Sequence, residues 1–250
     1  MDKVVISTMA TGGVLPVDWA GWKSFEWSGK PTARGYTGWS AVAAALRDRG
    51  TGRLLPNLLK NYNMSPDSMV VAVGFSAGSN DGLRELLRNA EDRNQIVAAV
   101  AVDGAHWNQK KQGATDPKDY WDWKGEAGPF DQMAQLAATS GKPFVTTASM
   151  VAAPVVPKQI LSTTREALAS ISGTTLGATG IAKSSPPGMF AVPLTGTVKG
   201  QQVSKAPIDG WSQGGFVASV WPGNQPNDHI WQANTLVPQA LAYLRAKGIT

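Results

Sequence analysis

Runs of apolar and β-branched residues recur along the chain and predict the strands of a buried sheet. The clearest is Gln95–Val102, which is apolar from Ile96 onward, as expected for a parallel strand covered on both faces. The strands predicted in this way are Lys3–Ser7, Ser68–Val73, Gln95–Val102, Pro143–Ser149 and Gly215–Val220.

Segments with helical spacing of apolar residues lie between these runs. The range Thr37–Arg49 is one example, because its Trp39, Val42 and Leu46 fall on one side of a helix. The other predicted helices are Leu54–Tyr62, Asp81–Asp92, Pro129–Thr139, Thr163–Ile171 and about Trp231 to Lys247. Pro238 should kink or restart the last of these, since proline removes a helix hydrogen bond.

Strands and helices that alternate on short connections imply parallel βαβ units. We therefore predict an α/β fold with a doubly wound, mostly parallel sheet, helices on both faces, and a single domain over residues 1–250. Residues 14–36 lack a clear period and are expected to form a long loop. Residues 104–127 and 172–213 are candidate lid or flap segments, and a disordered loop is the alternative for 172–213.

The composition narrows the class of protein. The chain has 250 residues, of which 42% are apolar, with 23 basic and 18 acidic side chains and a net charge of +5. This charge is modest and not concentrated in runs, so nucleic-acid binding is not favoured. No window approaches a membrane span and no signal peptide is visible, so we expect a soluble protein that is cytoplasmic or phage-associated.

Cysteine and histidine counts limit the chemistry. The chain has no cysteine, which excludes disulfides, thiolate catalysis and cysteine-based zinc sites. Its 2 histidines leave little room for a histidine-rich metal site. We therefore expect no metal and no other cofactor.

Tryptophan is unusually frequent, with 10 in the chain. Trp107, Trp121 and Trp123 lie among polar residues, where exposed aromatic rings suit sugars or acyl chains. We expect Trp107, together with His106 and Phe75, to contact the substrate.

The stretch Met69–Gly78 carries the strongest candidate for chemistry, because an apolar run breaks there into Gly-Phe-Ser-Ala-Gly and then into a helical pattern. In a GxSxG turn the serine occupies a strained strand-to-helix corner, and small residues are needed two positions before and after it because the backbones crowd. Ser76 is therefore the predicted nucleophile. A plain glycine and serine turn is the structural alternative.

A serine hydroxyl needs a base within hydrogen-bond reach and a third group that orients this base. The only histidines of the chain are His106 and His229. His229 follows the last predicted strand and precedes the last helix, which fits the chain order of serine, acid and histidine. We favour His229 as the base and keep His106 as a base or a structural hydrogen-bond donor.

No local motif identifies the acid that would orient the histidine. No Asp or Glu lies between Gly141 and Arg165, although the acid more often follows the strand predicted there. Asp103 ends the preceding strand, and parallel strands deliver their carboxyl ends to one crevice. We predict Asp103 as the acid, with capping of the next loop as its structural alternative. Asp228 competes, but its adjacency to His229 makes an orienting geometry difficult.

Three motifs together resemble the α/β-hydrolase superfamily of serine esterases, lipases and peptidases: Gly74-Phe-Ser-Ala-Gly78, Asp103-Gly-Ala-His106 and Asn227-Asp-His-Ile-Trp-Gln232. The resemblance covers the whole chain in outline and begins at an early strand, as in compact cutinase-like members. The Asp-Gly-x-His pattern and the segment Ser162–Glu166 also resemble less well characterised α/β hydrolases of bacterial and phage origin.

This resemblance implies roles for individual residues. Ser76 is implied as the nucleophile, Asp103 as the acid and His229 as the base. Backbone N–H groups of Ala77 and of the Ala10–Thr11 region are implied as donors to the oxyanion. For the loop that contains Ala10–Thr11, an ordinary glycine turn is the alternative.

The leading hypothesis is a metal-independent serine hydrolase that cleaves an ester, with an amide as the second choice, through an acyl-enzyme. Its substrate would be a small-molecule, glycan or lipid ester. A hypothesis from a different class is a binding or virion-type structural protein that keeps the scaffold without turnover, since fold does not fix function.

Overall fold

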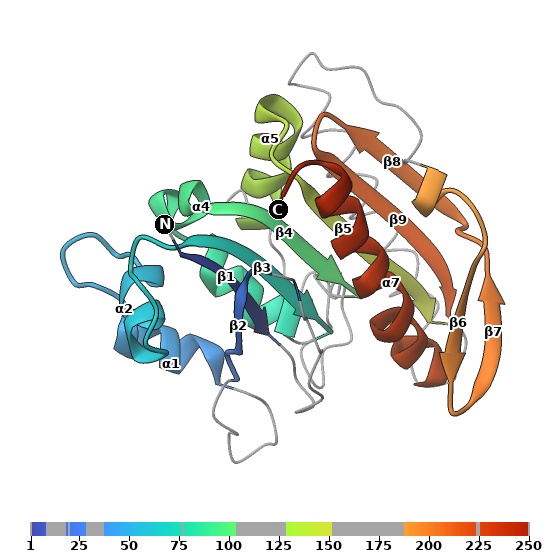
Figure 1. Ribbon diagram of the computed structural model, residues 1–250, viewed down its shortest axis with the longest axis horizontal. Helices are drawn as coiled ribbons and strands as arrows, with labels where there is room; N and C mark the ends of the chain where they lie inside the picture. The colour runs from blue at the N-terminus through green and yellow to red at the C-terminus, as the bar shows by residue number, and fades with distance from the viewer. Residues whose placement is uncertain are drawn as a thin grey trace, which may run out of the picture.

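The computed structural model describes residues 2–8, 19, 21–28, 38–76, 78–103, 129–151, 188–223 and 226–249. Its centre is a seven-stranded sheet with the order β2-β1-β3-β4-β5-β9-β8 (Figure 1). The pair β8 and β9 is antiparallel, and the other neighbours are parallel, which confirms the predicted α/β architecture. The strands of this sheet are β1 (Lys3–Thr8), β2 (Lys23–Glu26), β3 (Met69–Phe75), β4 (Ile96–Val102), β5 (Phe144–Val151), β8 (Asp209–Gln213) and β9 (Phe216–Gly223).

Helices cover both faces of the sheet. Successive side chains of a strand point to opposite faces, so each strand contributes to two apolar cores. Val70 and Ala72 of β3 join the core under α1, α2, α3 and α5, whereas Val71 and Val73 join the core under α7. The helices are α1 (Trp39–Leu46), α2 (Leu55–Asn61), α3 (Arg84–Leu87), α4 (Ala90–Gln95), α5 (Pro129–Ser140) and α7 (Pro226–Ala246). In the part of the chain that the structure describes, none of these helices has the length and apolarity to cross a membrane.

The segment after Ser76 is not the single helix predicted over Asp81–Asp92. A π-helical turn, η1 (Gly78–Leu83), leads into the short α3, and α4 starts anew at Ala90. Asn89 causes the break, because its backbone is extended and its side chain accepts the N–H groups of Glu91 and Asp92 at 2.9 and 3.2 Å. Asparagine at a helix N-cap offers the backbone an alternative to continuing the previous helix.

Two stretches expected to be irregular contain strands. Within residues 14–36, β2 pairs in parallel with β1 at the edge of the sheet. Within 172–213, the antiparallel hairpin of β6 (Leu194–Val198) and β7 (Gln201–Lys205) follows a 3-10 turn, η4 (Gly188–Phe190), and precedes β8. These strands are partly exposed, so they lack the continuous apolar runs that marked the central strands. The predicted helix Thr163–Ile171 and the stretch 104–127 lie outside the described residues.

The last helix differs from its prediction at its start and in its middle. It begins at Pro226, so His229 lies in its first turn and not in a preceding loop. It continues without a restart through Pro238, where we predicted a kink or a restart, and Pro238 lies on its exposed side. Figure 1 shows α7 crossing one face of the sheet, with its amino end close to the carboxyl ends of the strands.

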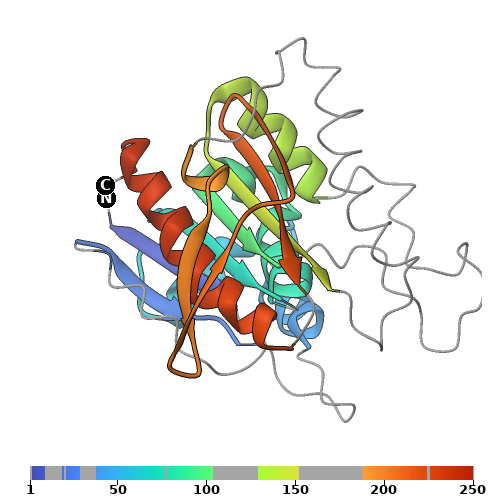
Figure 2. The ribbon, with the colours of Figure 1, turned by 90° about the vertical axis from the view of Figure 1, so that its right-hand side faces the viewer.

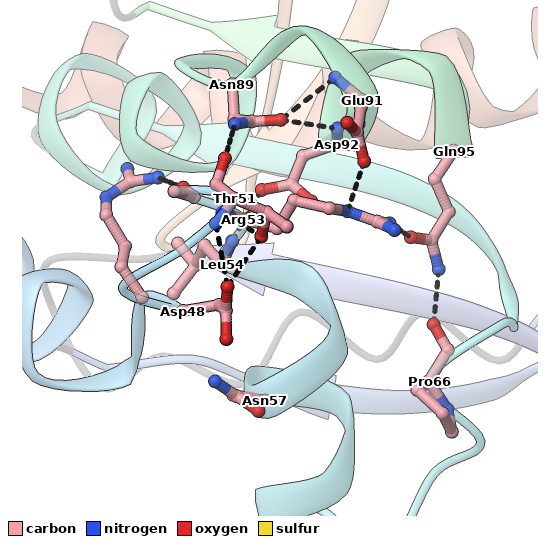
Figure 3. Close-up of polar contacts among 12 residues, drawn as sticks. Asp48, Thr51, Arg53, Leu54, Asn57, Pro66, Asn89, Glu91, Asp92 and Gln95 are labelled. Carbon is pink, nitrogen blue, oxygen red and sulfur yellow. Dashed lines mark hydrogen bonds and ion pairs between the residues drawn. The ribbon is translucent and has the colours of Figure 1, made fainter.

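A buried aspartate joins the connection before α2 to α4 (Figure 3). Asp92 is fully buried and accepts the Leu54 backbone N–H at 2.6 Å and the Arg53 Nε at 3.1 Å. Gln95 continues this network by donating to the backbone oxygens of Pro66 and Ser68 at 2.8 and 2.9 Å. The network therefore fixes α4 against the segment that leads into β3.

We predict that Asp92→Ala lowers the free energy of unfolding by about 3 kcal/mol, because a buried N–H and a guanidinium lose their acceptor. Urea denaturation followed by circular dichroism measures the change. Glu91→Ala is the matched control: its side chain is 64% exposed and lies 3.6 Å from the same Arg53 Nε. The control should change stability by less than about 0.5 kcal/mol. Equal losses in the two variants would contradict the role of Asp92.

Candidate active site

The carboxyl ends of β3 and β4 are neighbours in the sheet. Phe75 pairs with Val102 at the last position of the two strands. The Ser76 N–H then donates to the Val102 carbonyl at 3.0 Å. Ser76 and Asp103, the residues that follow these strand ends, therefore leave the sheet side by side.

Ser76 occupies a strained turn of the kind the GxSxG motif predicts. Its φ angle is 54°, in the left-handed region that residues with a Cβ rarely adopt. The Ser79 N–H donates to the Ser76 carbonyl at 3.0 Å and closes the turn. A Cβ on Gly74 would lie 2.7 Å from Ser79 Cα, so the small residue expected two positions before Ser76 is a steric requirement.

The end of β1 supports this turn from the side. The Thr8 hydroxyl donates to the Gly78 carbonyl at 2.8 Å. A Cβ on Gly82 would lie 2.7 Å from Thr8 Cβ, so the π-helical turn can approach β1 only because residue 82 is glycine. The backbone that follows Ser76 is thus held against β1 by a hydrogen bond at Gly78 and by close packing at Gly82.

His229 and Asp103 are in contact although they are 126 residues apart in the chain. The His229 Nδ1 meets the Asp103 carboxylate Oδ2, and their side chains are 30% and 3% exposed. When the carboxylate is ionised it can only accept, so Nδ1 carries the proton of this contact, and in a neutral ring Nε2 is then an acceptor. The pair thus combines a buried acid with a partly accessible imidazole.

Asp103 is held by Thr147 and Gln232, two residues to which the sequence analysis gave no role. Its φ angle is 47°, which aspartate tolerates better than most residues, and its N–H donates to Thr147 Oγ1 at 3.2 Å. The Thr147 hydroxyl in turn donates to Gln232 Oε1 at 3.2 Å, and both side chains are fully buried. This chain links β4, β5 and α7 behind the contact of Asp103 with His229. In the sequence these two residues stand out only as polar side chains at buried positions, Thr147 in β5 and Gln232 in α7.

Phe75 packs against the imidazole. The two ring centroids lie 4.4 Å apart with an interplanar angle of 30°. Phe75 is itself buried, so its ring supports one face of His229. The sequence predicts Phe75 as a substrate contact, and in the structure its ring packs against His229.

The other predicted site residues have different outcomes. Asp228, the competing acid, forms an ion pair with Lys205 of β7. The predicted oxyanion donors and the remaining predicted substrate contacts lie outside the described residues: Ala10, Thr11, Ala77, His106 and Trp107.

Asp81 is an acidic group that lies in the turn after Ser76. Burial raises the pKa of its carboxyl, Glu85 raises it further, and Arg84 partly opposes these effects. Asp81 therefore becomes charged at a higher pH than an exposed aspartate.

Comparison with known proteins yields distant matches. No family model and no curated protein matches the chain. A puromycin-hydrolyzing peptidase of Mycobacterium tuberculosis is 18% identical over 68% of this chain and 29% of that chain, with a TM-score of 0.33. Est1E from Butyrivibrio proteoclasticus is 14% identical over 70% of this chain and 75% of that chain, with a TM-score of 0.32. The chain spans less than a third of the length of this peptidase.

We predict that Gly74→Ala lowers the free energy of unfolding by about 1–3 kcal/mol, because the added Cβ overlaps the backbone of Ser79. Urea denaturation at an unchanged m-value measures this loss. Gly188→Ala is the control, since a Cβ there meets no atom of the described residues within 4 Å. A Gly74→Ala protein as stable as the control would show that the turn is not tightly packed.

Proposed function

We propose that this chain is a serine hydrolase that cleaves an ester, with an amide as the second substrate class, through an acyl-enzyme. Ser76 is the nucleophile, His229 the general base and Asp103 the acid. The contact of His229 Nδ1 with the buried Asp103 carboxylate carries this proposal, because Asp103 leaves the sheet beside Ser76. The motifs that resemble α/β hydrolases support the same assignment.

The chemistry follows from the direction in which the imidazole is held. With Nδ1 occupied by Asp103, Nε2 takes the proton of Ser76 Oγ as this oxygen attacks the carbonyl carbon of the substrate. The tetrahedral intermediate collapses, the ester C–O bond breaks, and His229 returns the proton to the leaving alcohol. Water then attacks the acyl-enzyme with His229 as base. The carboxylic acid product leaves, and His229 returns the proton to Ser76 Oγ.

Asp103 stabilises the charged imidazole in both halves of this reaction. A buried carboxylate is screened little by water, so its attraction for the imidazolium is stronger than that of an exposed one. Charge at Asp103 therefore lowers the energy of the states in which His229 holds the proton of Ser76. The absence of a carboxylate between Gly141 and Arg165 is compatible with this role, because β4 delivers Asp103 to the same edge of the sheet.

The remaining parts of the site are proposed from the sequence motifs. The N–H groups of Ala77 and of the Ala10–Thr11 region are the proposed oxyanion donors. Trp107 and His106 are the proposed contacts for a small-molecule, glycan or lipid acyl group. No metal or organic cofactor takes part in the proposed reaction.

Ser76→Ala should abolish both ester hydrolysis and covalent labelling by a fluorophosphonate, because these reactions need the same oxygen. Loss of the nucleophile in such a triad lowers turnover by about 10⁶-fold. The measurements are release of p-nitrophenol from p-nitrophenyl esters of graded chain length, and intact-protein mass after labelling. Labelling at another serine would contradict the assignment. A wild-type chain that neither turns over nor reacts would favour a non-catalytic binding or virion structural protein.

Asp103→Asn should lower kcat by about 10⁴-fold, because an amide in place of the acid favours the wrong imidazole tautomer and cannot stabilise the charged form. His229→Ala should be at least as damaging, whereas His106→Ala should be milder. The steady-state rates of these variants measure the ranking. Asp67→Asn, on an exposed loop, is the control for loss of one negative charge. A larger loss in Asp228→Asn than in Asp103→Asn would move the acid to the competing position.

A further inference from the structure

The β6–β7 hairpin is fastened to the first half of α7, the helix that carries His229. Figure 2 shows the hairpin lying along this helix. Trp231 Nε1 donates to the Val203 carbonyl at 2.9 Å. A Cβ on Gly196 would lie 1.8 Å from Thr235 Oγ1, so the hairpin approaches the helix as closely as only a glycine allows. The position of the first turn of α7 therefore depends on the hairpin.

Lys205, the last residue of β7, is the charged part of this attachment. Its ammonium pairs with the Asp228 carboxylate and donates to the Pro222 carbonyl of β9 at 3.1 Å. It also lies 5.5 Å from the ring centroid of Trp231. The two paired side chains are 11% and 15% exposed, so water screens their attraction less than at an open surface. One ammonium thus joins β7, β9 and α7.

Asp228 creates an electrostatic conflict because it directly precedes His229. Among the described residues, Asp103 of β4 contacts the imidazole directly, while Asp228 of α7 precedes His229 in the chain and pairs with Lys205 of β7. An unpaired carboxylate one residue from the imidazole would favour the protonated ring. Protonated His229 cannot take the proton of Ser76, so an uncompensated Asp228 would hinder the base.

We propose that Lys205 is a positioning residue for the base. It neutralises Asp228, holds that carboxylate toward the hairpin, and so leaves the imidazole directed at Asp103. This role rests on the proposed function, in which His229 is the base. It also gives the β6–β7 hairpin a role beyond covering α7, because the hairpin supplies the positive charge that pairs with the carboxylate next to the base.

The test is a double-mutant cycle of Lys205→Gln, Asp228→Asn and the double variant. It is measured by NMR titration of the imidazole resonances. The chain has 2 histidines, and His106→Ala assigns the signal of His229. Lys205→Gln should raise the titration midpoint of that signal by about 0.5–1 pH unit, and Asp228→Asn should lower it, because each removes one charge close to the ring. The double variant should return to within about 0.2 pH unit of the wild type, since both charges are then absent. The acidic limb of the kcat/KM profile should shift in the same directions.

Matched variants separate charge from packing. Lys199→Gln removes the same charge from the turn of the same hairpin, where the side chain is exposed, and should leave the midpoint unchanged. Lys205→Arg keeps the charge and should keep the wild-type midpoint. If Lys205→Gln does not fold, Asp228→Asn and Lys205→Arg still decide the question.

An unchanged midpoint in Lys205→Gln or in Asp228→Asn, or a double variant that stays shifted, would overturn the positioning role. The proposed function fails separately. A wild-type chain that a fluorophosphonate does not label refutes catalysis at Ser76, whereas the NMR titration reports on the imidazole without any turnover.

Discussion

The parallel pairing of β3 with β4 is the constraint on which the rest of the site depends. It places the Phe75–Val102 pair at the strand ends, and the Ser76 N–H extends the ladder by one bond to Val102. The two strands run in the same direction, so the residues after them emerge at one edge of the sheet. Both Ser76 and Asp103 then turn with positive φ angles, which directs the chain sharply away from the strands. α7 brings His229 to the same edge from the opposite end of the sequence.

Such an arrangement is strained and must be held by its surroundings. Left-handed backbone at a residue with a Cβ costs about 1–3 kcal/mol, and a buried carboxylate needs partners. Gly74 and Thr8 hold the turn at Ser76, while Thr147 and Gln232 hold the end of β4 against α7. The apolar cores on both faces of the sheet supply the stability that keeps this geometry in place. On the proposed function, this rigidity keeps the imidazole oriented throughout turnover.

The fold could be predicted where the chain is buried and not where it is at an edge. The central strands and α5 show apolar patterns long enough to identify them. The edge strand β2 and the hairpin of β6 and β7 are partly exposed, so their sequences carry no continuous apolar run. The helix after Ser76 was predicted as one piece, since its apolar spacing continues through Asn89 while a side-chain cap divides the backbone. The side-chain cap at Asn89 ends the first helix and starts α4, although the apolar spacing continues across it.

The sequence by itself determined the strand and the tight turn at Ser76, and it reduced the candidates for a general base to two histidines. Local residues specify a turn through sterics, so a five-residue motif is enough to predict it. The sequence favoured Asp103 as the acid from its place at a strand end, but only the tertiary structure brings its carboxylate to the imidazole, across 126 residues of the chain. It also brought Lys205 to Asp228, which no periodicity encodes. Contacts between distant segments depend on strand order and helix placement, and these are set by the packing of the whole sheet.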